Sequence, residues 1–533
     1  MTTFSDTAVL DTLAGSLKLA LPEIALTATA CLLFAHGMLL KVRGLNWTLA
    51  LFGLLIAAGI ALAYQLAIQY GPDGSWRLVG VAAEPFDDAQ RFVAPILPSG
   101  FASFVRWLTL GSGFVLLFLS TKEARHGMAG EYYGCLLVAL AGCSLVARAN
   151  DLVTLFVALE MISIPTYVLL YLPSRNPAGQ ESAAKYFLLS ILASAVLLFG
   201  LSYLYGLAGT TNISALVDTL TRVHKVGPVP PLAVLAMVLT VAGLAFRITA
   251  VPFHYYAPDV YQGGPTAVVA QMAVLPKIAG FVVLARLLGL TSPPLTELPF
   301  SIGTQIPLML WVMAAVTMTL GNMMALIQEN LKRIMAYSGI AHAGYILLGF
   351  VAATSYGSSE TGPAHLAGLD SVLVYLVAYA LMTLGVFAAI IALGSPERPV
   401  ENADDLAGAA TTHPLTAACL AVCLLSLIGM PFTAGFVGKL MLFFGLIDTP
   451  TGSGFGVMNR VLAVVAAVNA AVAAIYYLRL LGIVYLRSPM HPDAKSRGLG
   501  PVVAAVVCAL GTLAIGLYAK PLIDLAQLAT PSQ

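Results

Sequence analysis

The sequence predicts an all-α integral membrane protein with about fourteen transmembrane helices. Hydrophobic residues make up 59% of the 533 residues and charged residues only 10%, whereas about a quarter of an ordinary soluble domain is charged. So few charges cannot cover the surface of a soluble protein of this size, so the bilayer must be the solvent. The net charge of +1 offers no basic surface to a nucleic acid, and we expect no such partner.

Fourteen apolar runs are long enough to span a bilayer, which requires about 20 mostly apolar residues. They cover residues 17–40, 47–69, 102–120, 131–149, 151–172, 184–207, 231–253, 262–289, 303–326, 331–353, 370–394, 412–446, 458–486 and 499–522. No segment between them is long enough for a soluble domain, and the start of the chain has no pattern of a removable signal peptide.

Two of the predicted helices are interrupted. Helix seven runs into residues 250–256 (AVPFHYY), and helix twelve contains residues 429–439 (GMPFTAGFVGK). Proline and glycine free backbone carbonyls, which a membrane tolerates only where protein or water satisfies them. Paired breaks indicate two inverted repeats, helices four to eight and nine to thirteen, although two ordinary proline kinks would give the same pattern. The expected parts are an N-terminal three-helix segment, two antiporter-like repeats and a C-terminal helix, at residues 1–130, 131–290, 291–490 and 491–533.

Lysine and arginine are unevenly divided between the two sides of the predicted bundle. Twelve of the 26 lie in the loops of one side and seven in those of the other. By the positive-inside rule the first side faces the cytoplasm, so both termini face outward.

The cysteines give no sign of a metal or redox centre. All six lie within apolar stretches and are interpreted as small core residues. The sequence has no iron–sulfur, haem or nucleotide-phosphate motif. We therefore expect no cofactor and no metal in this chain, and any redox chemistry must belong to other subunits.

Ionisable residues within the predicted helices are the candidate functional residues, because charges are costly in hydrocarbon. Glu160 lies nine residues into helix five, which is about 14 Å deep at 1.5 Å per residue, and Lys277 lies near the middle of helix eight. The full set of candidates is Glu160, Arg247, His254, Lys277, His342 and Lys439.

A series of such residues in different helices favours a proton route over static ion pairs, which would cost insertion energy repeatedly. Desolvation lowers the pKa of a lysine and a nearby carboxylate raises it, so moving the carboxylate makes the lysine take up or release a proton. Arginines near helix ends are interpreted as snorkelling or interface residues, namely Arg106, Arg148, Arg286 and Arg479.

Five segments, in order and spacing, resemble the antiporter-like subunits of proton-pumping NADH:quinone oxidoreductase, respiratory complex I. They are residues 155–170 (LFVALEMISIPTYVLL), 245–266 (AFRITAVPFHYYAPDVYQGGPT), 275–281 (LPKIAGF), 330–345 (NLKRIMAYSGIAHAGY) and 430–443 (MPFTAGFVGKLMLF). In this resemblance Glu160 lies at the functional glutamate of helix five, and Lys277 lies at the central lysine of helix eight.

Three features favour the subunit N branch over its sisters L and M. Residues 21–23 (LPE) open helix one, residues 258–261 (PDVY) follow helix seven, and Lys439 lies where subunit M has a glutamate. One feature departs from the family, which usually has a lysine at the position of Arg247. Because a guanidinium keeps its proton in a protein, we expect Arg247 to be a fixed counter-charge for Glu160 and not a proton carrier.

The resemblance implies a membrane-arm subunit of a translocase, with no redox centre of its own. Electron transfer from NADH to quinone in other subunits would drive protons along an axis of buried residues. FMN, iron–sulfur clusters and quinone are expected in partner subunits, the nearest partners are the antiporter-like subunit M and the small subunit K, and the chain also contacts membrane lipid. The implied location is the bacterial inner membrane, with periplasmic termini. The expected axis links Glu160, Arg247, Lys277, His342 and Lys439.

Two other functions remain open from the sequence. A subunit of a multi-subunit sodium/proton antiporter or of a membrane-bound hydrogenase would share the fold and the buried lysine and glutamate. A purely structural membrane anchor would have charged residues that apolar residues of equal size can replace in pairs.

Overall fold

The computed structural model of the protein describes most of the chain. It covers residues 6–40, 43–65, 69–70, 76–77, 94–121, 128–172, 177–226, 230–290, 305–355, 368–395, 399–449, 455–489 and 498–530. Within these ranges the regular structure is helical, apart from a pair of two-residue antiparallel strands, β1 (Gln69–Tyr70) and β2 (Trp76–Arg77).

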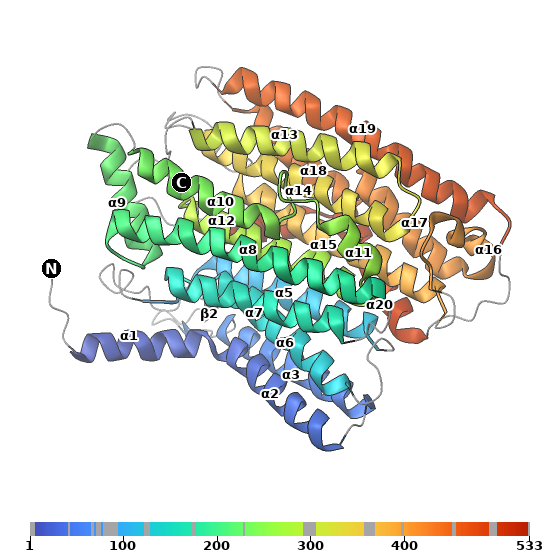
Figure 1. Ribbon diagram of the computed structural model, residues 1–533, viewed down its shortest axis with the longest axis horizontal. Helices are drawn as coiled ribbons and strands as arrows, with labels where there is room; N and C mark the ends of the chain where they lie inside the picture. The colour runs from blue at the N-terminus through green and yellow to red at the C-terminus, as the bar shows by residue number, and fades with distance from the viewer. Residues whose placement is uncertain are drawn as a thin grey trace.

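The longer helices lie roughly side by side in one bundle (Figure 1). The first part of the chain forms α1 (Asp6–Leu19), α2 (Leu21–Leu40), α3 (Arg43–Gln65), α5 (Gly100–Leu119), α6 (Ala129–Val146), α7 (Leu152–Tyr171), α8 (Pro177–Ala208), α9 (Ile213–Val226), α10 (Pro231–Arg247), α11 (Ala257–Gly263) and α12 (Thr266–Leu287).

The second part begins at residue 305. It forms α13 (Gln305–Leu326), α14 (Leu331–Ser355), α15 (Leu369–Leu393), the 3-10 helix η2 (Ala403–Leu406), α16 (Ala409–Thr412), α17 (Pro414–Ile428), α18 (Ala434–Ile447), α19 (Gly456–Leu486), α20 (Leu499–Leu517) and α21 (Lys520–Ala529). In Figure 1, α13 and α19 lie along the upper edge of the bundle, and α2 and α3 lie at its lower edge.

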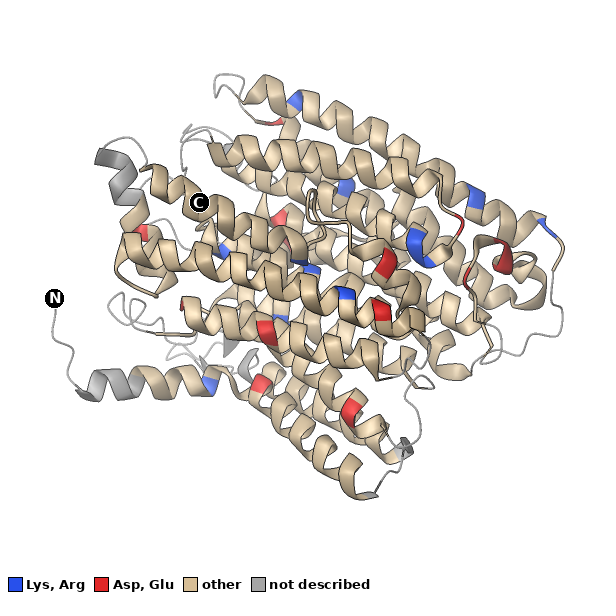
Figure 2. Cartoon of the chain, in the orientation of Figure 1, with Lys and Arg blue, Asp and Glu red and all other residues tan. Residues whose placement is uncertain are grey.

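The predicted fold class is confirmed. Twelve helices in the described residues are long and apolar enough to cross a membrane. The other two predicted spans are the interrupted ones: helix seven, residues 231–253, is α10 followed by the turn that contains Pro252, and helix twelve is α17 followed by α18. Figure 2 shows long stretches of these helices without any charged residue. The division of the chain into two inverted repeats remains a prediction.

Each break has a local backbone cause. In helix seven, α10 ends at Arg247, and a turn containing Pro252 leads to α11. In helix twelve, Gly429 closes α17 with a left-handed φ of 95°, a conformation that glycine adopts without steric cost. The hydroxyl of Ser426 then accepts a hydrogen bond of 2.9 Å from the backbone N–H of Gly435 in the first turn of α18. The break in helix twelve leaves the last carbonyls of α17, those of Leu427 and Ile428, free to accept hydrogen bonds from a side chain.

The centre of the bundle is formed by α12, α14 and α15. The first two are buried along the whole of their membrane-spanning stretches, and α15 is nearly so. The outer helices α2, α3 and α20 bury only about a third of theirs. Lys277 on α12 and His342 on α14 are therefore enclosed by protein and not by lipid.

Three arginines correct the sequence interpretation. Arg106, Arg148 and Arg286 are buried, so they do not snorkel to a membrane interface. Arg106 forms an ion pair of 2.8 Å with Glu23, joining α5 to α2, and Arg286 donates from Nε to the carbonyl of Ala147 at the end of α6, at 2.8 Å. Each of these side chains bonds to a neighbouring helix, which the sequence did not reveal.

The cysteine interpretation needs a smaller correction. Five of the six cysteines are buried, as expected, but Cys31 on α2 is exposed on the outside of the bundle. The exposed Arg479 agrees with its interpretation as an interface residue.

Candidate functional site

The first half of the site is an ion pair between two neighbouring helices. Glu160 lies in the middle of α7, and Arg247 is the last residue of α10, just before the break. Nη2 of Arg247 lies 2.7 Å from Oε1 of Glu160. The arginine side chain is only 5% exposed and the glutamate side chain 20% exposed, so water screens the pair weakly. The expected pairing of Arg247 with Glu160 is thus observed.

The guanidinium of Arg247 has further partners, which fix its orientation. Nη1 donates to the hydroxyl of Ser163 at 2.6 Å and to the carbonyl of Leu159 at 3.1 Å, both on α7. Nη2 also donates to the hydroxyl of Ser194 on α8 at 3.1 Å, and that hydroxyl donates to Glu160 at 2.7 Å. A planar fork of donors suits this arrangement better than the ammonium of a lysine would.

The second half of the site begins at Lys277, which is fully buried in the middle of α12. Its Nζ donates to the carbonyl of Gly339 on α14 at 2.6 Å and to the hydroxyl of Tyr379 on α15 at 2.9 Å. Both partners are neutral. Among the described residues, no carboxylate forms an ion pair with Lys277.

His342 lies between two tyrosine hydroxyls. Its Nδ1 is 2.6 Å from Oη of Tyr375 on α15, and its Nε2 is 3.3 Å from Oη of Tyr477 on α19. Tyr477 is also hydrogen-bonded to the hydroxyl of Ser338. An imidazole can donate at one nitrogen and accept at the other, and a phenol can do both, so this arrangement is compatible with either direction of proton transfer.

Lys439 lies in the second turn of α18, and its side chain reaches back to the break of helix twelve. Its Nζ donates to the carbonyls of Leu427 and Ile428, at 2.9 and 2.8 Å, which are the last carbonyls of α17. A cation at the C-terminal end of a helix is favoured by the helix dipole. Nζ also lies 4.8 Å from the ring centroid of Tyr345. The break therefore supplies the groups that stabilise the charge of this buried lysine.

Two tyrosines connect these residues. Nζ of Lys277 lies 5.0 Å from the ring centroid of Tyr379, and that ring lies 5.5 Å from the ring of His342. The ring of Tyr345 lies 5.8 Å from the ring of His342, and Nζ of Lys439 lies over the ring of Tyr345. We call this series the lysine–tyrosine–histidine chain: Lys277, Tyr379, His342, Tyr345 and Lys439.

The structure does not bring all candidates together. His254 lies half-buried in the turn between α10 and α11. Its Nδ1 is buried and has no hydrogen-bond partner among the described residues.

The Glu160–Arg247 ion pair and the lysine–tyrosine–histidine chain lie on neighbouring helices. This is shown by Gly280 on α12, one turn after Lys277, where a Cβ would be only 3.5 Å from Cβ of Arg247 on α10. In the part of the chain that the structure describes, no group of three or more His, Cys, Asp or Glu side chains could hold a metal ion.

Sequence reasoning missed the hydroxyl groups of the site. No tyrosine was among the candidate residues, but Tyr375 and Tyr379 lie inside α15, four residues apart on one face. That spacing within an apolar helix was the available signal. Ser163 and Ser194 carried no such signal, because serine is common at helix contacts in membranes.

The fold and site together define a class of protein, the antiporter-like membrane subunits with interrupted helices and buried lysines. Residues 149–466 match the protein-family model described as "NADH:quinone oxidoreductase/Mrp antiporter, TM". The NADH-quinone oxidoreductase subunit N of Geobacillus kaustophilus is 39% identical over 78% of this chain and 80% of its own. The chain belongs to the family of NADH-quinone oxidoreductase subunit N.

Two solved structures show the same fold. A chain of respiratory complex I from Thermus thermophilus is 29% identical, with a TM-score of 0.73 over 95% of this chain and 99% of its own. A chain of the Mrp complex from Dietzia is 22% identical, with a TM-score of 0.76 over 96% of both chains. The second likeness shows the fold alone, at an identity too low to indicate a shared function.

Proposed function

We propose that this chain translocates protons across the membrane as a membrane-arm subunit of a proton-pumping NADH:quinone oxidoreductase. The observation that supports this most is the lysine–tyrosine–histidine chain, in which two buried lysines lie at the ends of a continuous series of side chains joined by a hydrogen bond and by ring contacts. The electron transfer to quinone that drives it would take place in other subunits, which would hold the FMN, the iron–sulfur clusters and the quinone.

The two halves of the site would have different tasks. The hydrogen bonds of Lys277 and Lys439 go to neutral carbonyl and hydroxyl groups, so no carboxylate among the residues that the structure describes locks either lysine in its charged form. Each can therefore take up and release a proton. Arg247 keeps its proton and would act as a counter-charge that holds Glu160 in one position or releases it. A movement of Glu160 would change the electrostatic field at Lys277 on the adjacent helix.

The route through the membrane follows from the order of these groups. Protons would enter from the cytoplasm near helices seven and eight, or through a neighbouring subunit, and would leave near helix twelve.

We place the chain in the bacterial inner membrane with periplasmic termini, beside subunits M and K. We divide it into the repeats 131–290 and 291–490. The distribution of Lys and Arg among the loops supports this orientation.

The alternatives have less support. The likeness to the Mrp chain concerns the fold, and no observation favours sodium as the transported ion. A structural anchor does not need buried lysines whose ammonium groups have no carboxylate partner in the described part of the chain, because such charges are costly to bury and join no helices by ion pairs.

The test of the proposal is the variant Lys277→Ala in the assembled complex. We expect proton pumping by membrane vesicles to fall to near background while assembly, measured on native gels, stays normal. The matched control is Lys520→Ala, which removes an exposed lysine at the start of α21 and should pump normally. Normal pumping by Lys277→Ala at normal assembly would refute the proposed role.

A further inference from the structure

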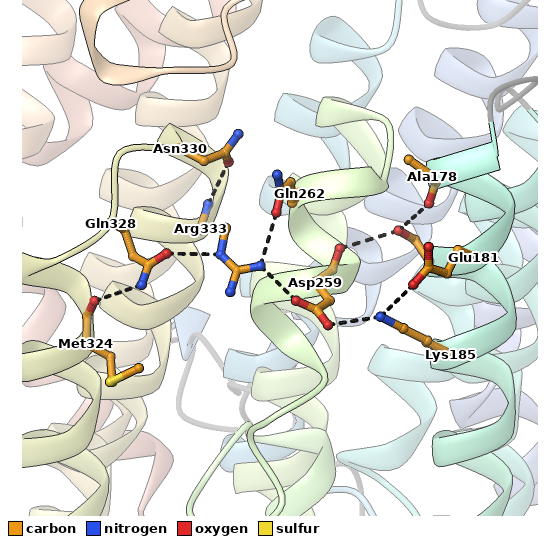
Figure 3. A network of polar contacts seen from close by, with 10 residues as sticks. Ala178, Glu181, Lys185, Asp259, Gln262, Met324, Gln328, Asn330 and Arg333 are labelled. Atoms are coloured by element: carbon orange, nitrogen blue, oxygen red, sulfur yellow. Dashed lines mark hydrogen bonds and ion pairs between the residues drawn. The ribbon is translucent and has the colours of Figure 1, made fainter.

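A second cluster of charges lies outside the buried site, around Asp259 on α11 (Figure 3). Nζ of Lys185 lies 3.0 Å from Oδ2 of Asp259, and Nη1 of Arg333 lies 2.7 Å from Oδ1. The two cations come from different helices, α8 and α14. One carboxylate therefore joins three helices, using one oxygen for each cation.

Neighbouring side chains hold the two cations in place. Arg333 also donates to the side-chain oxygens of Gln328 and Gln262, each at 3.0 Å. Lys185 also forms an ion pair of 2.7 Å with Glu181, one turn earlier on α8. Figure 3 shows this arrangement, with Asp259 between Arg333 on one side and Lys185 on the other.

Backbone contacts hold α11 between the same two helices. Nζ of Lys332 is buried and donates to the carbonyl of Gly264, directly after α11, at 2.9 Å. On the other side Gly263 packs against α8 so closely that a Cβ there would lie 2.5 Å from the carbonyl oxygen of Ala178 and would collide with Ser182. Because α11 is clamped in this way, a shift of α8 or α14 cannot leave it unchanged.

Each of the three helices that Asp259 joins is connected along the backbone to a residue of the buried site. On α8, Ser194 lies nine residues after Lys185, about 14 Å along the helix at 1.5 Å per residue, and contacts both Glu160 and Arg247. On α14, the carbonyl that binds Lys277 belongs to Gly339, six residues or about 9 Å beyond Arg333. Preceding α11 is the break that begins at Arg247. Asp259 thus joins the helix that carries Ser194, a partner of the Glu160–Arg247 pair, to the helix that carries Gly339, a partner of Lys277.

We propose that Asp259 is a positioning residue for proton translocation, which fixes α8, α11 and α14 so that movement at the Glu160–Arg247 pair is transmitted to Lys277. This inference rests on the proposed function and adds the mechanical link between its two halves. Two-state movements of packed helices are the physical means by which distant groups are coupled.

The ion pairs that Asp259 forms with Lys185 and Arg333 persist only while its carboxylate is ionised. Partial burial raises the pKa of Asp259, but the hydrogen bonds from Lys185 and Arg333 outweigh burial and hold the pKa below its ordinary value. The carboxylate therefore stays ionised at neutral pH. Since Asp259 is 44% exposed, its ion pairs add little to overall stability, and their removal should affect coupling more than folding.

The test is the ratio of protons pumped to NADH oxidised in vesicles that contain the whole complex. We expect Asp259→Asn to lower this ratio about threefold or more, within the range of mutations that act on coupling between sites, while assembly stays normal. Asp259→Glu should restore part of the ratio, because it keeps the charge. The matched control is Glu181→Gln, which removes the other partner of Lys185 but leaves the three helices joined, and its ratio should equal that of the wild type.

Several outcomes separate this inference from the proposed function. Pumping by Lys277→Ala would overturn both. If Lys277→Ala does not pump and Asp259→Asn has the wild-type ratio, the positioning role alone is overturned. If Asp259→Asn fails to assemble, the test uses Lys185→Met and Arg333→Gln, each of which removes one of the two ion pairs of Asp259. Wild-type ratios in both variants would overturn the inference, and lowered ratios in both would support it.

Discussion

Replacing Arg247 with alanine should abolish proton pumping, because it leaves the carboxylate of Glu160 without its cation. In the wild type this carboxylate has one ion pair of 2.7 Å with Arg247 and one hydrogen bond of 2.7 Å from Ser194. In the Arg247→Ala variant only the hydroxyl remains. Removing one partner of a buried ion pair costs about 3–5 kcal/mol. We expect the lower end of that range here, because the side chain of Glu160 is 20% exposed.

A loss of about 3 kcal/mol corresponds to roughly a hundredfold change in an equilibrium. The position in which Glu160 is held beside the end of α10 would therefore become roughly a hundredfold less populated, and the switching role proposed for the carboxylate would be lost. Arg247→Lys should retain pumping, at a reduced rate, because an ammonium keeps the charge but has only three donors for the four acceptors that the guanidinium contacts.

The assay is the initial rate of pumping by vesicles, divided by the rate of NADH oxidation and by the amount of assembled complex. Arg479→Ala is the matched control, since Arg479 is exposed on α19 and should be replaceable without loss. Wild-type pumping by the Arg247→Ala variant would refute the counter-charge role and would leave Glu160 in need of another partner.

Three further predictions concern other charges. Lys439→Ala should impair pumping and Lys439→Arg should restore little of it, because a guanidinium keeps its proton; full recovery in vesicles with arginine would show that a fixed charge is sufficient. Arg106→Met should reduce the thermal stability of the complex by about 3–5 kcal/mol, because it leaves the carboxylate of Glu23 buried and unpaired, and adding Glu23→Gln should recover most of this; an unchanged melting temperature in the single variant would contradict it. Since the pKa of Asp259 is lowered, its ion pairs contribute fully above the ordinary carboxyl pKa of about 4 and are lost only as the pH falls through the lowered value. The pumping of Asp259→Asn relative to wild type should thus be constant between about pH 6 and 8, and a ratio that varies there would show that another group titrates.

The sequence was sufficient for the fold because a membrane imposes simple rules. An apolar run of about 20 residues can satisfy its backbone only as a helix, and Pro252 and Gly429 mark the two positions where this pattern fails. Helix ends were less certain: the last predicted helix, residues 499–522, ends at Leu517 as α20 and is followed by the separate helix α21. The amphipathic helix α9 was missed, because it is too polar to appear in a search for spans.

For the site, the charges could be found from sequence but their partners could not. Glu160, Arg247, Lys277 and Lys439 stand out because charge is rare in these helices. Which helices face one another, however, is decided by packing, and packing depends on residues with little individual signal. The interpretation of Arg106 failed for this reason, since position along a helix does not tell whether the side chain faces lipid or the neighbouring helix that carries Glu23.

The neutral surroundings of Lys277 have a consequence for the voltage across the membrane. Lys277 is the twelfth of the 22 residues of α12, and so lies near the middle of the bilayer, and no carboxylate of the described ranges forms an ion pair with its ammonium group. A charge that crosses the whole membrane does work of about 2.3 kcal/mol per 100 mV, so a charge that reaches the middle does roughly half of that. Each 100 mV would then change the loading of this lysine about sevenfold. Under the proposed function, the membrane potential that the complex generates would therefore alter the protonation of Lys277.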